Sequence, residues 1–64
     1  MKIVLNGEPQ EVEARSLAAL LEEAGISGRV ATAVNEAFVP SALRSRHMLA
    51  EGDRIEVVAP MQGG

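Results

Sequence analysis

The fold class is decided by residues 2–25, KIVLNGEPQEVEARSLAALLEEAG, in which the hydrophobic period changes halfway along. The first part, KIVLN, is apolar and rich in β-branched residues, and Asn-Gly at 6–7 follows it. Asn-Gly between two strand-like runs favours a hairpin, because both turn positions need a positive φ. After Pro9, QEVEA alternates polar and apolar residues and predicts the second strand, with Glu11 and Glu13 facing water.

The second part, SLAALLEEAG, predicts a helix. Its apolar residues recur at the i, i+3, i+4, i+7 spacing of one helix face: Leu17, Leu20, Leu21 and Ala24. Ser16 is in place to be the N-cap, and Gly25 is in place for a left-handed C-terminal cap. One amphipathic helix therefore follows the hairpin.

The remaining sequence predicts three more strands. RVATAVN from Arg29 is the third, AFV at 37–39 is a short fourth ended by Pro40, and RIEVVAP at 54–60 is the last. Between them, SALRSRHML leaves open a loop or a single helical turn, anchored by Leu43, Met48 and Leu49. A turn is expected at 51–53.

This order predicts an α+β roll. We expect a mixed sheet of four to five strands with one main helix packed on one face, because a single helix leaves the other face partly wet. Residues 1–59 form the domain, and residues 60–64 form a flexible C-terminal diglycine tail.

Length and composition limit the possible functions. Sixty-four residues make at most one domain, and without cysteine there is no disulfide or thiolate metal site to support it. The formal net charge is −3, and the clustered basic and aromatic residues that nucleic-acid binding needs are missing. No apolar run approaches the roughly 20 residues of a membrane span, and the start is polar too soon for a secretory signal. We therefore expect a cytoplasmic protein that binds neither nucleic acid nor membrane.

The side chains offer little for catalysis. His47 is the single histidine, and with nearby Ser45 it is too little for a triad of nucleophile, base and orienting group. One histidine and scattered carboxylates also lack the spacing of a zinc or calcium site, and no phosphate-binding loop occurs. We expect no enzymatic activity from this chain alone, and no bound metal or cofactor.

The sequence ends in PMQGG, residues 60–64, and the two glycines raise a second possibility. From Ala59 onward an extended chain reaches about 20 Å, at roughly 3.3–3.6 Å per residue, which is enough to enter another protein's active site. A terminal carboxylate is ionised and unreactive toward nucleophiles at pH 7. It must first be converted to a species with a good leaving group, such as an acyl adenylate made from ATP. A frayed end is the alternative, and the tail alone leaves both open.

Several blocks of the sequence carry a resemblance to a known family. They are KIVLNGE at 2–8, LAALLEE at 17–23, VATAVNEAFVP at 30–40, LAEGDRIEVV at 49–58, and the final GG. Together, at this spacing and length, the chain resembles the ThiS family, the sulfur carriers of bacterial thiamine biosynthesis, which have a ubiquitin-like β-grasp fold. The family often has Arg directly after the proline, where this sequence has Ser41.

The resemblance implies a function for the tail. An E1-like activating enzyme would adenylate the carboxylate of Gly64 with ATP. Sulfur from a persulfide, supplied by a cysteine desulfurase or a rhodanese-type donor, would then replace AMP and leave a thiocarboxylate. Thiazole synthase would take that sulfur into the thiazole ring of thiamine. Gly63 would be the slim neighbour of Gly64, and Gln62, Met61 and Pro60 would lie in the partner's groove.

Partner docking is expected on the open sheet face, with Phe38 and Val58 as candidates. Plain core packing is the alternative for Phe38, and a flexible exposed side chain is the alternative for Met61. Three other functions stay open: a carrier like the small subunit of molybdopterin synthase, a protein modifier joined to lysines as ubiquitin is, and a binding domain whose tail is irrelevant.

Overall fold

The first hairpin forms where the sequence predicts it. The computed structural model describes residues 1–59, and in it strand β1 (Lys2–Leu5) pairs antiparallel with β2 (Glu8–Glu11). Asn6 and Gly7 form the connecting turn with φ values of 50° and 83°. Two consecutive positive φ values match a type I′ turn, whose twist suits a two-residue hairpin.

The second strand begins earlier than predicted. The two-residue turn places Glu8 directly opposite Leu5, so pairing starts before Pro9. The strand covers Glu8–Glu11, whereas the sequence predicted residues 10–14. Pro9 is tolerated because β2 is the outer strand of the sheet, and a residue without an N–H can lie on an unpaired edge. The alternating pattern of QEVEA therefore continues past the strand, and its Val12 and Ala14 are buried in the core.

Helix α1 (Leu17–Glu23) has both of its expected caps. Ser16 Oγ accepts a hydrogen bond from the third helical N–H at 3.1 Å. Gly25 follows the helix with a φ of 74°, and the N–H of Ile26 donates to the carbonyl of Leu21 at 2.9 Å. This is the arrangement of a Schellman cap, which satisfies carbonyls that a helix end leaves unpaired.

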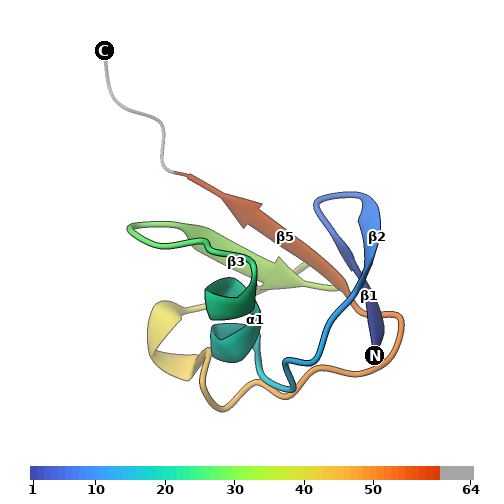
Figure 1. Ribbon diagram of the computed structural model, residues 1–64. Coiled ribbons are helices and arrows are strands. Elements are labelled where there is room, and N and C mark those ends of the chain that lie inside the picture. Colours follow the sequence, from blue (N-terminus) through green and yellow to red (C-terminus); the bar gives the residue numbers. More distant parts are fainter. Residues whose placement is uncertain (60–64) are drawn as a thin grey trace.

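Three further strands complete a five-stranded mixed sheet. They are β3 (Ala31–Val34), β4 (Ala37–Val39) and β5 (Arg54–Val58), and the spatial order is β2-β1-β5-β3-β4. β5 is parallel to β1 and antiparallel to β3, and all other neighbours are antiparallel. β3 starts two residues later than the predicted Arg29. Figure 1 shows α1 lying across one face of this sheet. The predicted α+β roll with one helix on one face is confirmed.

The core fills the space between α1 and the sheet. The helix contributes Leu17, Leu20 and Leu21, and the strands contribute Ile3, Leu5, Val34, Val39 and Ile55. Ala24, the fourth residue of the predicted helix face, is exposed because it is already the C-cap. The ambiguous segment forms a short 3₁₀ helix (Ser41–Leu43). Of its three expected anchors only Leu49 is buried, whereas Leu43 and Met48 are exposed.

Two turn asparagines hold β5 from both sides. Asn6 Oδ1 accepts from the N–H of Val57 at 2.8 Å, and so extends the pairing of β1 with β5 beyond the end of β1. On the other side Asn35, in the β3–β4 turn, accepts through Oδ1 from the N–H of Arg54 at 2.9 Å. Asn35 also donates its own N–H to the carbonyl of Arg54 at 2.7 Å. β5 is therefore fixed by both hairpin turns as well as by both neighbouring strands.

The last predicted strand was expected to run to Pro60, whereas β5 ends at Val58. The tail, residues 60–64, lies outside the described residues. Within residues 1–59, no helix is long and apolar enough to cross a membrane.

Replacing Leu20 with alanine tests the core. Leu20 is fully buried between α1 and the sheet, so Leu20→Ala should lower the free energy of unfolding by about 2–5 kcal/mol, from lost burial and a residual cavity. Phe38→Ala is the control, because Phe38 is exposed and its loss should change that free energy by less than about 0.5 kcal/mol. Urea unfolding followed by circular dichroism measures both. An equal loss of unfolding free energy in the two variants would contradict the assignment of Leu20 to the core and of Phe38 to the open face of the sheet.

Candidate functional site

The end of β5 immediately precedes the tail in the sequence, so a partner that binds the tail must approach the domain here. Ile55 and Val57 face α1, while Glu56 and Val58 face the opposite, open side of the sheet. Val58 is 61% exposed, and β5, of which it is the last residue, ends at the periphery of the domain (Figure 1). The two-residue period of a strand predicts from the sequence that Ile55 and Val57 share one face and Glu56 and Val58 the other, and the structure confirms this.

Phe38 shares this open face with Val58. Across the sheet, Ala33 lies opposite Phe38 on one side and opposite Glu56 on the other, and Ala31 lies opposite Val58. Paired residues point to the same face of a sheet. Because the two alanines carry only methyl groups, the sheet between the larger side chains is hollowed, with a volume of about 200 Å³.

Phe38 itself is 69% exposed. The alternative that it packs in the core is therefore wrong: its neighbour Val39 is the β4 residue that takes a core position. A large aromatic side chain and a valine around a shallow apolar hollow are typical of protein interaction surfaces. The charged groups beside them are Glu56, on the same face, and the exposed Arg54–Glu36 pair at 3.9 Å.

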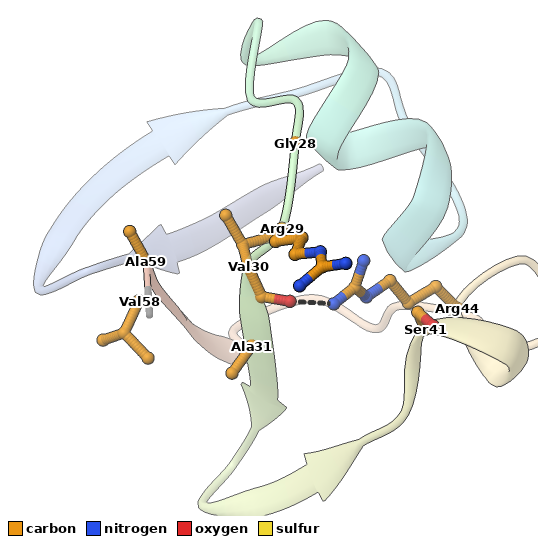
Figure 2. A pocket seen from close by; sticks show the side chains of 8 residues that line it. All are labelled: Gly28, Arg29, Val30, Ala31, Ser41, Arg44, Val58 and Ala59. Atoms are coloured by element: carbon orange, nitrogen blue, oxygen red, sulfur yellow. Dashed lines mark hydrogen bonds between the residues drawn. The ribbon is translucent and has the colours of Figure 1, made fainter. Parts of the chain in front are cut away.

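A second polar arrangement supports the neighbouring end of β3. Thr32 is buried, and its Oγ1 donates to the carbonyl of Val39 at 2.8 Å. The same oxygen accepts from Arg44 Nε at 2.9 Å, and Arg44 Nη2 donates to the carbonyl of Val30 (Figure 2). Arg44 thus joins the segment after β4 to the start of β3. Sequence reasoning did not single out Thr32 or Arg44, because no local pattern relates residues twelve positions apart.

The remaining candidates are His47, the acidic residues and the tail. His47 is half-buried, and its carbonyl accepts from the N–H of Leu17 at 2.9 Å. Among residues 1–59, no three His, Cys, Asp or Glu side chains come together as metal ligands. The predicted tail residues lie outside the described part of the chain: Pro60, Met61, Gln62, Gly63 and Gly64. Their assignments stay predictions.

Comparisons with known proteins add to this geometry. A family model described as the ThiS family matches residues 3–64. The chain is 47% identical over 62 residues to the sulfur carrier protein ThiS of Thermus thermophilus, covering 94% of this chain and 95% of that protein.

Two solved structures of a ThiS thiamine biosynthesis protein from Geobacter metallireducens are similar in fold. The crystal structure superposes with a TM-score of 0.86 over the whole of both chains. The solution structure gives 0.79 and covers all of this chain and 88% of the other. Both are 22% identical in sequence, so they bear on the fold alone.

Substituting Thr32 tests the polar arrangement beside the site. Thr32→Val removes the hydroxyl, which leaves Arg44 Nε and the Val39 carbonyl without their partner, and should cost about 1–3 kcal/mol of unfolding free energy. Thr32→Ser keeps the hydroxyl and loses one methyl group, worth about 0.8 kcal/mol. Chemical denaturation should therefore rank wild type above Ser and Ser above Val. A valine variant as stable as the wild type would show that these hydrogen bonds contribute nothing.

Proposed function

This chain belongs to the ThiS family of sulfur carriers in thiamine biosynthesis, and we propose that Gly64 is the residue that carries the sulfur. The observation that supports this assignment is the extent of the family match, which runs through the two glycines to residue 64. Glycine suits the role because its carbonyl carbon has no side chain beside it to hinder attack.

The proposed chemistry has three steps, and partner enzymes catalyse each of them. A carboxylate oxygen of Gly64 attacks the α-phosphorus of ATP and releases pyrophosphate, which gives an acyl adenylate. The terminal sulfur of a persulfide then attacks the acyl carbon and displaces AMP, which gives an acyl disulfide. A thiol of the partner enzymes cleaves its S–S bond, so that the thiocarboxylate leaves and the donor's sulfur ends in a disulfide. Thiazole synthase finally transfers the sulfur to its substrate, and an oxygen atom from water or from that substrate restores the carboxylate.

The partners that we propose are those that membership of the ThiS family implies. ATP would be bound by an E1-like activating enzyme, and the persulfide by a cysteine desulfurase or a rhodanese-type protein. The carrier itself would hold no cofactor and catalyse no step, and the pathway would operate in the cytoplasm. Pro60, Met61, Gln62 and Gly63 would lie in the partner's groove, where the two glycines pass a narrow channel.

We assign docking to the open sheet face. Phe38 and Val58 stand on either side of its hollow, and Val58 is one residue from Ala59, where the described chain ends. A partner that receives the tail must approach this end of β5. An exposed aromatic residue in such a position is well suited to anchor the interface.

Intact mass spectrometry tests the assignment of Gly64. Incubation with ATP, the activating enzyme of the same organism and a sulfur source should add the difference between one sulfur and one oxygen, located on the last residue. A chain without Gly64 should show no change, because the reacting carboxylate is then displaced in the channel. The wild type keeping its original mass, with an activating enzyme shown to be active, would contradict the proposal.

Phe38→Asp tests the docking face. It should raise the KM of the activating enzyme for the carrier by about tenfold, the equivalent of roughly 1.4 kcal/mol for one anchor residue. Met48→Asp is a matched control, because Met48 is similarly exposed but outside the hollow. Steady-state adenylation kinetics at varied carrier concentration give both values. Identical KM values for the two variants would place docking elsewhere.

A further inference from the structure

A second and larger hollow lies beside the end of β5, on the side of the 3₁₀ helix. It has a volume of about 400 Å³, and its lining includes Arg29, Val30, Ser41, Arg44, Val58 and Ala59 (Figure 2). Apart from two guanidinium groups and one hydroxyl, these side chains are apolar. The hollow is formed by three segments that the fold holds together: the entry to β3, the segment after β4, and the end of β5.

The guanidinium of Arg44 lines this hollow in a fixed orientation, and only part of its hydrogen-bond donors are used. Its guanidinium donates through Nε to Thr32 Oγ1 and through Nη2 to the Val30 carbonyl, and these bonds set its orientation. A guanidinium has five N–H donors, so most of its capacity remains. Both ion pairs within residues 1–59 involve other groups, and neither includes Arg44. A half-buried charge of this kind is normally matched by an anion.

Arg29 adds a second positive charge to the same hollow. Figure 2 shows its guanidinium extending toward that of Arg44. Within the described residues it takes part in no ion pair. Nine acidic and six basic residues give the chain a formal net charge of −3, yet among residues 1–59 no carboxylate lines this hollow. The positive character is therefore local, and it is opposite to that of the protein as a whole.

The distance of the hollow from Gly64 limits which anion can bind in it. Ala59 lines it, and Gly64 is the fifth residue after Ala59, a distance of up to about 17 Å along an extended chain. When the tail is extended into a partner's active site, the phosphates of ATP react at Gly64, far from this point. A partner that takes up the tail therefore covers this hollow with the part of its surface that surrounds the entrance to its active site.

Resting on the proposed function, we infer that this hollow receives an acidic side chain from the mouth of the activating enzyme's tail channel. A carboxylate matches the planar fork of a guanidinium and can bind it through two parallel hydrogen bonds. Arg44 provides the fixed donors, Arg29 adds charge, and the Ser41 hydroxyl is a further donor on the same wall. The pair orients the body of the carrier so that the tail enters the channel.

Adenylation kinetics with charge variants test this inference. ATP–pyrophosphate exchange by the activating enzyme of the same organism is measured at varied carrier concentration. Arg29→Glu places a negative charge against the partner's carboxylate and should raise the KM for the carrier at least tenfold, with kcat within about twofold. Arg29→Lys keeps the charge and should stay within about threefold of the wild-type KM. Within residues 1–59 the side chain of Arg29 makes no hydrogen bond, so folding should be unaffected.

Arg15→Glu is the matched control. Arg15 is exposed, precedes α1 and lines neither of the two hollows, and the change in net charge is the same. Its KM should stay within about twofold of wild type. Salt gives an independent reading: between roughly 0.05 and 0.3 M NaCl the wild-type KM should rise, because screening weakens the attraction, whereas that of Arg29→Glu should not.

Each result separates the two proposals. No exchange with the wild-type carrier would refute the function proposed for Gly64. An active wild type with unchanged KM in Arg29→Glu would refute the acidic contact and leave that function intact. A lower KM in Arg29→Glu would mean that the hollow holds the chain's own terminal carboxylate in the free protein, which also overturns the inference.

Discussion

The parallel pairing of β1 with β5 is the constraint on which the rest of the structure depends. It places the first and last strands together at the centre of the sheet, with Leu5 opposite Ile55. Parallel neighbours cannot be joined by a tight turn, so the chain between them must supply the outer strands and the helix that covers one face. The start of β5 is then flanked by a strand on each side and its end by β3 alone. Asn35 holds the main chain of β5 at Arg54, and Asn6 holds it at Val57.

This arrangement accounts for the use that we propose for the domain, which is to present its tail to partner enzymes. The domain holds the end of β5 in a fixed position, and two surfaces with different properties meet at this end. The open face with Phe38 is apolar, and the hollow with Arg44 is positively charged. Val58 borders both of them. A partner that covers this end of β5 can therefore contact an apolar surface on one side and positive charge on the other, while the residue proposed to react, Gly64, comes five residues after Ala59 in the sequence.

The sequence predicted the features that are local. The Asn6-Gly7 turn, the caps of α1 and the alternation of β5 each arise within a few residues, and each is present in the structure. It predicted poorly what depends on contacts between distant segments. Pro9 led to a predicted start of β2 after residue 9, because proline is disfavoured inside a strand. Only the sheet order shows that β2 is an edge strand, in which proline is tolerated. The bond of Arg44 to Thr32 joins segments with no common pattern. The family resemblance, and not any side-chain geometry, led to Gly64.

Amide hydrogen exchange of the free carrier tests the central claim, that the β1–β5 pair is the most firmly held part of the sheet. The N–H groups of Val4 and Val57, which bond across the β1–β5 pair to Asp53 and Asn6, should exchange only through global unfolding. Their exchange free energies should then equal the unfolding free energy measured with denaturant. Exchange at these amides as fast as at the outer strands would show that the centre of the sheet opens locally, and would contradict the account.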